Sequence, residues 1–235
     1  MKQNIPLFTL FVIIALACEN TDKPKVVYTQ NSTAKGLIVD TAAVTMANLP
    51  IHFDSTNYLL FVVGKTHSYE RGSKIYIGSG SSSNESFSVG YFNGQSISGD
   101  IDNIKFQHID SIHIRALTTA QIKIRSFYFV HAIADVILLE VIDNDTNLDH
   151  KLTNEDVVSL YIANSEGTKF VKLSPDGYQL LDWELITAAN RIYFRTIKDV
   201  NRDGEFDKKD TFHHYFVSLK DEAFEPVKIF PLQTE

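Results

Sequence analysis

Two twelve-residue stretches of the chain carry oxygen-bearing residues at matching positions, and the second is the more complete. It runs from Asp199 to Asp210 and reads DVNRDGEFDKKD. Its donors at positions 1, 3, 5, 7, 9 and 12 are Asp199, Asn201, Asp203, Glu205 (through its backbone carbonyl), Asp207 and Asp210. Gly204 at position 6 suits a sharp turn with positive φ, and Phe206 at position 8 can pack inward. Calcium takes about six to eight oxygen ligands, so the stretch predicts a calcium site.

The first stretch runs from Asp145 to Asp156 and reads DTNLDHKLTNED. Its donors at the same positions are Asp145, Asn147, Asp149, Lys151 (through its carbonyl), Thr153 and Asp156. His150 stands where Gly is expected. His enters the left-handed region more readily than most residues, so this site is predicted to be weaker rather than absent. An Asp- and Asn-rich surface turn without metal remains the alternative for both stretches.

Both loops resemble those of the EF-hand superfamily, and especially those of dockerins, which also place Asp at position 12. Asp reaches less far than Glu as a bidentate ligand. The resemblance therefore implies weak sites, with dissociation constants of about 10⁻⁴ to 10⁻³ M, the range of extracellular modules. Calcium, bound at two sites, is the expected cofactor.

The elements around the loops read as short strands. Examples are Leu37–Val39, Tyr58–Val63, Lys74–Ile77, Ile122–Val130 and Val136–Ile142. Side chains on both faces of Ile122–Val130 are apolar toward its end, so that strand is predicted to be buried on both sides there. Asp145 and Asp199 are 54 residues apart, and aromatic and aliphatic residues around the loops match at the same spacing: Phe129 with Trp183, Tyr161 with Tyr215, and Phe170 with Phe224.

Each copy of this repeat reads as strand, strand, calcium loop, strand, turn, strand. The fold class predicted is all-β, with twisted antiparallel sheets and propeller-blade-like repeats that carry the two loops between strands. Only two copies are evident, with residues 48–112 as the candidate for a third, diverged copy, so a closed propeller is not expected. The repeat resembles those of bacterial lipoproteins with propeller-like blades, best over residues 122–230. A two-repeat region over 122–235 is expected to follow an N-terminal β region over 26–121.

The N-terminus predicts export and a lipid anchor. Lys2 precedes an apolar run, Leu7–Leu16, that has the length of a signal-peptide core and is too short to span a bilayer. The single Cys of the chain, Cys18, follows Ala15-Leu16-Ala17 and resembles the lipidated Cys of a bacterial lipobox. We therefore expect a signal peptide over 1–17, a lipidated Cys and tether over 18–25, and an anchor in the bacterial cell envelope, at the outer membrane.

The net charge and the lack of known catalytic motifs limit the classes of function that fit this sequence. The net charge is −7 and no basic stripe is present, which disfavours a nucleic-acid partner. No nucleophile elbow, HExxH or SxxK pattern occurs, and Cys18 as an anchor leaves no thiol for catalysis. The predicted function is a membrane-anchored calcium-binding lipoprotein with a structural or ligand-binding role, toward a protein or glycan partner. The alternative is an extracytoplasmic hydrolase or glycan-binding accessory protein, for which Trp183 between Asp182 and Glu184 could form a sugar subsite.

Overall fold

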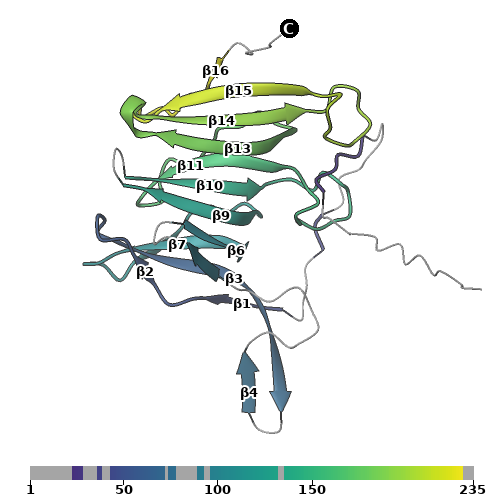
Figure 1. The fold of residues 1–235 in the computed structure, drawn as a ribbon. Coiled ribbons are helices and arrows are strands. Elements are labelled where there is room, and N and C mark those ends of the chain that lie inside the picture. The colour runs from purple at the N-terminus through teal and green to yellow at the C-terminus, as the bar shows by residue number, and fades with distance from the viewer. Residues whose placement is uncertain are drawn as a thin grey trace, which may run out of the picture.

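The computed structural model describes residues 23–28, 36–38, 43–71, 74–77, 89–92, 96–131 and 135–229. These residues form three antiparallel sheets, and no α-helix occurs among them (Figure 1). The all-β prediction is confirmed. Of the predicted strands, Leu37 and Ile38 are described but lie outside any strand.

The first sheet is built on one long strand, β3 (Tyr58–Arg71). It pairs with β1 (Ala43–Ala47), β2 (Ile51–His52), β4 (Lys74–Ile77) and β7 (Asn103–His108), and β7 pairs with β8 (Ile114–Ala116). β4 and the distal part of β3 form a hairpin that projects away from the other strands (Figure 1).

The middle sheet has the order β12-β11-β10-β9-β6-β5. Its strands are β5 (Val89–Phe92), β6 (Ser96–Ile101), β9 (Lys123–Val130), β10 (Val136–Ile142), β11 (Val158–Asn164) and β12 (Val171–Lys172). This sheet takes strands from both sides of residue 121, because β6 pairs directly with β9. The expected division into two regions at that residue stays a prediction.

The third sheet is a meander of four strands, β13 (Tyr178–Ile186), β14 (Arg191–Lys198), β15 (Thr211–Ser218) and β16 (Val227–Ile229). A single 3-10 turn, Thr187–Ala189, joins β13 to β14 and ends at Asn190 in the left-handed region. A bulge at Leu181 interrupts the pairing of β13 with β14.

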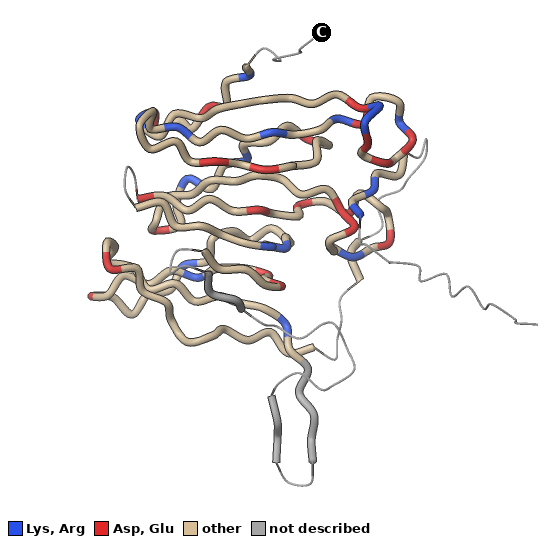
Figure 2. Tube along the Cα trace, viewed as in Figure 1, with Lys and Arg blue, Asp and Glu red and all other residues tan. Residues whose placement is uncertain are grey.

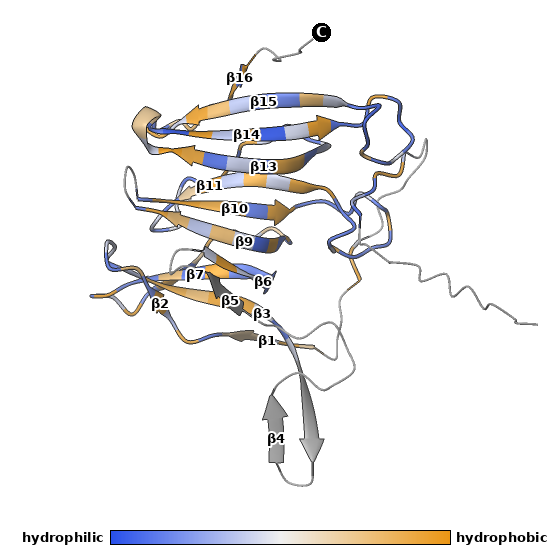
Figure 3. Cartoon of the chain, in the orientation of Figure 1, coloured by the Kyte–Doolittle hydropathy of each residue, from blue (hydrophilic) through white to orange (hydrophobic). Residues whose placement is uncertain are grey.

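Two hydrophobic cores lie on opposite faces of the middle sheet. One face contributes Phe127, Phe129 and Leu139 to the core shared with the first sheet. The other contributes Leu138 and Leu160 to the core shared with the third sheet. A strand covered on both faces needs a nearly continuous apolar run, and β10 supplies one in VILLEVI, in which Glu140 is the single polar residue and is only partly buried. The prediction that the end of the strand at Ile122–Val130 is buried on both sides is confirmed. Strongly hydrophobic residues accordingly lie along the stacked strands, while hydrophilic residues gather in the loops at one end (Figure 3).

The 54-residue repeat corresponds to two units of the same strand order. β9, β10, β11 and β12 form the first, and β13, β14, β15 and β16 form the second, each with its Asp-rich loop between the second and third strands. Matching residues face the preceding sheet in both units: Phe129 and Tyr161 contact the first core, and Trp183 and Tyr215 contact the second. The described sheets do not close into a ring. The prediction that the two units are propeller-like blades is not confirmed.

Several expectations concern residues outside those the structure describes. These are the signal peptide over 1–17, Cys18, and the tether up to residue 22. Within the described ranges, none of the helical segments has the length and apolarity needed to cross a bilayer.

Candidate metal centre

The two Asp-rich loops follow the same backbone course. Position 4 has positive φ in both, 62° at Leu148 and 60° at Arg202. Position 6 does too, 67° at His150 and 85° at Gly204. The left-handed turn predicted at position 6 is therefore confirmed in both loops, including the one that lacks Gly. Both loops project from the same end of the molecule, where Asp and Glu residues gather (Figures 1 and 2).

The position-1 carboxylate closes the turn from inside. Asp145 Oδ2 accepts a hydrogen bond from the backbone N–H of His150 at 2.8 Å. Asp199 Oδ2 accepts the equivalent bond from Gly204 at 2.9 Å. The first and sixth residues are thus joined in both loops, which holds position 6 in the left-handed conformation.

The position-12 carboxylate joins the two ends of each loop. Asp156 accepts hydrogen bonds from the N–H groups of Thr146 at 2.7 Å and Thr153 at 2.9 Å, one on each oxygen. Asp210 does the same with Val200 at 3.1 Å and Asp207 at 3.0 Å. These donors stand at positions 2 and 9 of both loops, so the position-12 carboxylate lies within the loop.

Positions 3 and 5 form turns stabilised by their own side chains. Asn147 Oδ1 accepts from Asp149 N–H at 3.0 Å, and Asn201 Oδ1 accepts from Asp203 N–H at 2.9 Å. The position-5 carboxylates accept in turn from the N–H at position 7, that of Lys151 or Glu205. This bond holds the pKa of Asp203 below its ordinary value.

Three of the loop carboxylates are buried. Asp156, Asp199 and Asp210 are 0%, 4% and 8% exposed, and within the described part of the chain none of them pairs with a Lys or Arg. Burial raises the pKa of Asp156 even though three backbone N–H groups oppose the shift. A buried anion is costly unless hydrogen bonds or a metal compensate. Backbone N–H groups supply the hydrogen bonds here, and a bound cation would offset the remaining negative charge.

The twelve predicted ligand positions are therefore gathered into two compact loops, but their side chains do not converge. Among the described residues, no three His, Cys, Asp or Glu side chains are grouped so as to hold a metal ion. The donor set, made of carboxylate, amide and carbonyl oxygens, fits calcium in type and order. Binding would require the carboxylates to turn from the backbone N–H groups toward one point.

The N-terminal segment lies against both loops, a contact that no sequence pattern indicated. Lys25 N–H donates to the carbonyl of Glu155 and Val26 N–H to that of Gly204. Backbone donors carry no residue signature, so only the arrangement of the chain in space could show this. The pKa of Tyr28 is raised by burial and then by the negative charge of the nearby Asp199.

A polar network fixes the strand end that leads into the first loop. Asp143 Oδ2 accepts hydrogen bonds from the Tyr161 hydroxyl at 2.7 Å and from Lys172 Nζ at 2.6 Å, and Lys172 also pairs with Asp176. Burial, followed by the hydrogen bond to Asp143 and its charge, raises the pKa of Tyr161 above the ordinary 10.0. The network ties β11 and β12 to the residues just before Asp145.

This network predicts a loss of stability in alkali. Because the pKa of Tyr161 is raised on folding, its contribution is complete below pH 10.0 and is lost as the pH rises above that value. Melting temperatures of the wild type and Tyr161→Phe, measured between about pH 8 and 11, should converge at the alkaline end. At neutral pH the variant should be about 1 kcal/mol less stable. Parallel profiles would show that Tyr161 is not part of the alkaline transition.

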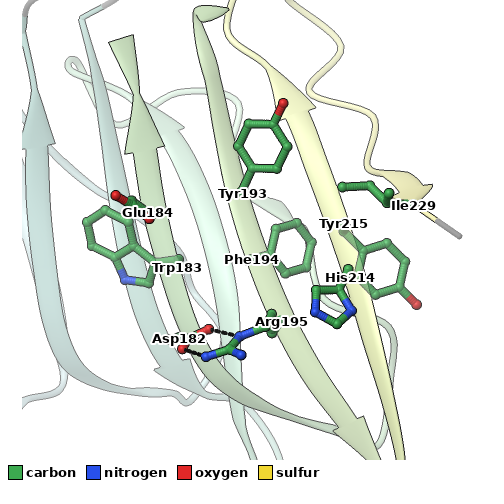
Figure 4. A pocket seen from close by; sticks show the side chains of 9 residues that line it. All are labelled: Asp182, Trp183, Glu184, Tyr193, Phe194, Arg195, His214, Tyr215 and Ile229. Carbon is green, nitrogen blue, oxygen red and sulfur yellow. Dashed lines mark hydrogen bonds and ion pairs between the residues drawn. The ribbon is translucent and has the colours of Figure 1, made fainter. Parts of the chain in front are cut away.

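Trp183, the residue considered for a sugar subsite, has structural contacts. Its Nε1 donates to Glu140 Oε1 at 3.2 Å, and its ring centroid lies 5.4 Å from that of Tyr128. A groove of about 340 Å³ runs past it over β13, β14 and β15, but the neighbouring Asp182 is paired with Arg195 there (Figure 4). Arg195, mainly by hydrogen bonding, lowers the pKa of Asp182. Trp183 thus links the third sheet to the middle sheet, Asp182 is paired within the third sheet, and a sugar subsite at Trp183 stays a prediction.

The chain was compared with protein-family models and with curated proteins. No family model matches the chain, and no curated protein matches it.

Proposed function

We propose that this protein is a calcium-stabilised lipoprotein, anchored in the bacterial cell envelope at the outer membrane, with a structural or binding role. The observation that carries the calcium part is the repetition of one loop architecture at two places 54 residues apart. The φ values at positions 4 and 6 and the hydrogen bonds of the carboxylates at positions 1 and 12 agree between loops of different sequence.

Calcium in these loops would act on the sheets rather than on helices. The first loop joins β10 to β11 and the second joins β14 to β15, two central strand pairs that face the same core. A sensor EF-hand responds by opening a pair of helices, and strands joined in sheets have no such movement. The metal would instead offset the charge of the buried carboxylates and hold the ends of the strands.

The two four-stranded units are proposed to be blade-like repeats of an open stack. Supporting this are their matching strand order and the matching direction in which Phe129 and Trp183 face. Stacked units of this kind leave faces and edges for a protein or glycan partner. A nucleic-acid partner is disfavoured by the net charge of −7. The anchor would be Cys18, following the export signal in the sequence.

Calorimetric titration with calcium tests the metal proposal. Two sites are expected, with dissociation constants of about 10⁻⁴ to 10⁻³ M, and the tighter one in the second loop because Gly204 adopts positive φ without strain. Asp203→Ala should remove the tighter site and Asp149→Ala the weaker one. Asp54→Ala, at a fully exposed acid outside both loops, is the matched control and should bind as the wild type does. Absence of a binding heat in the wild type, at millimolar calcium, would contradict the proposal.

A further inference from the structure

Residues Lys25–Tyr28, called the strap below, run between the two Asp-rich loops. Three successive N–H groups reach the loops alternately: Lys25 to Glu155 O at 2.8 Å, Val26 to Gly204 O at 2.9 Å, and Val27 to Thr146 O at 2.8 Å. Glu155 and Thr146 belong to the first loop and Gly204 to the second. Successive N–H groups of an extended chain point to opposite sides, so the strap bonds one loop on each side, as a strand would. Its segment lies beside both loops in Figure 1.

Side chains and a second segment extend this contact. The Thr146 hydroxyl donates to the carbonyl of Lys25 at 2.7 Å, and the Arg202 guanidinium lies 6.0 Å from the centroid of the Tyr28 ring. Further along, Ile38 N–H donates to His150 O at 2.8 Å. The carbonyl at position 6, that of His150 or Gly204, therefore accepts a hydrogen bond from the N-terminal part of the chain in both loops.

The strap is held by hydrogen bonds more than by burial. Val27 and Tyr28 remain 44% and 49% exposed, and Lys25 is exposed as well. A groove of about 590 Å³ runs beside it, and its lining includes Lys23–Lys25 and Glu205–Asp207. A segment with few buried apolar contacts opens locally at low cost. Its attachment therefore depends on loops that keep their carbonyl groups in place.

We propose that the strap is a calcium-dependent clasp: the two loops hold Lys25–Tyr28 between them when they bind metal and release it when they do not. This rests on the proposed calcium binding. The carbonyls that accept the strap belong to residues at loop positions 2, 6 and 11, beside the proposed ligands. Metal at about ten times its dissociation constant raises the ratio of ordered to disordered loop by a factor of about 11. The ratio of held to released strap rises by up to the same factor.

The position of the strap gives the clasp a role. Lys25 lies seven residues after Cys18, the proposed lipid anchor (25 − 18 = 7). A held strap fixes the point at which the tether leaves the folded sheets, and a released strap lengthens the tether. Calcium would thereby set how closely the protein is held to its membrane.

Hydrogen exchange of the backbone amides, followed by mass spectrometry on the full chain, tests the clasp. The N–H groups of Lys25, Val26 and Val27 should exchange about 10-fold more slowly in calcium at ten times its dissociation constant than in chelator. Magnesium at the same concentration should protect them less. The amides of β8, an exposed edge strand of the first sheet, exchange through local opening and serve as the internal reference that should not change.

A pair of glycine variants separates the clasp from general strain. Gly204 has φ +85°, and a Cβ there would lie 2.5 Å from the carbonyl oxygen of Val26. Gly177 has a similar φ of +74°, with nothing within 4 Å of its added Cβ. At a calcium concentration that calorimetry shows to saturate the variant, Gly204→Ala should therefore still expose the strap amides to exchange, whereas Gly177→Ala should keep them protected. Val26→Pro removes one strap donor without changing either loop, and should speed exchange at Lys25 and Val27 while calorimetric calcium binding persists.

Two results would overturn the clasp, and they differ in what they say of the metal. If calorimetry shows calcium binding but strap exchange is equal in calcium and chelator, the clasp is wrong and the calcium sites stand. If calorimetry shows no binding and the strap does not respond, the calcium proposal fails and the clasp fails with it. Protection that responds to calcium in the wild type and Gly177→Ala, but not in Gly204→Ala, supports the clasp.

Discussion

Truncation of either Leu138 or Leu139 to Ala is expected to lower the free energy of unfolding by about 2 to 5 kcal/mol. The two residues are neighbours in β10, and each is 1% exposed, yet they belong to different cores. Leu139 packs toward the first sheet and Leu138 toward the third. Each truncation removes apolar contacts and leaves a cavity that the surrounding sheets can only partly fill. Chemical denaturation, fitted for both midpoint and slope, measures the change.

The matched control is Leu181→Ala. Leu181 is the same residue type in a neighbouring sheet, but it sits at the bulge of β13 and is 43% exposed. Its truncation should change stability by about 0.5 kcal/mol or less. A cost near zero for Leu138→Ala or Leu139→Ala would show that the corresponding face of the middle sheet is not covered.

Calcium is expected to raise the melting temperature by roughly 6 to 12 °C. A site filled at ten times its dissociation constant adds about 1.4 kcal/mol, so two sites add about 3 kcal/mol. For a chain of this size each kcal/mol corresponds to roughly 2 to 4 °C. The added stability comes from neutralising the negative charge of the loop carboxylates. Over the two loops together, three of these carboxylates are buried without a Lys or Arg partner within the described residues. Differential scanning calorimetry in calcium and in chelator gives the shift.

The double variant Asp149→Ala with Asp203→Ala should abolish the calcium shift. Both residues stand at position 5 of their loops, so the two changes are equivalent by design. Asp54→Ala with Asp110→Ala removes the same charge from two exposed acids elsewhere and should leave the shift intact. An undiminished shift in the loop variant would mean that calcium acts at another place.

The loops were the part of the site most open to prediction from sequence, because their conformation is local. Asp and Asn side chains reach N–H groups two to ten residues away within the same loop, and Gly204 permits the turn at position 6. His150 shows that local hydrogen bonds are sufficient even where Gly is missing. Its φ of 67° is uncommon for a residue with a Cβ, yet the bond from its N–H to Asp145 holds it there. Local hydrogen bonding therefore fixed the loop even where the preferred residue was missing.

By itself, the sequence determined the all-β class, the 54-residue repeat and both loops, since strand alternation and turn chemistry act over a few residues. Only the tertiary structure decided which sheet covers which face, that β5 and β6 join the middle sheet, and that Lys25–Tyr28 lies between the loops. An apolar face is visible in a sequence, but the surface that covers it is not. The strap contacts run through backbone N–H and carbonyl groups, which every residue except Pro carries alike. Their partners are therefore set by where the chain passes and not by which residues it contains.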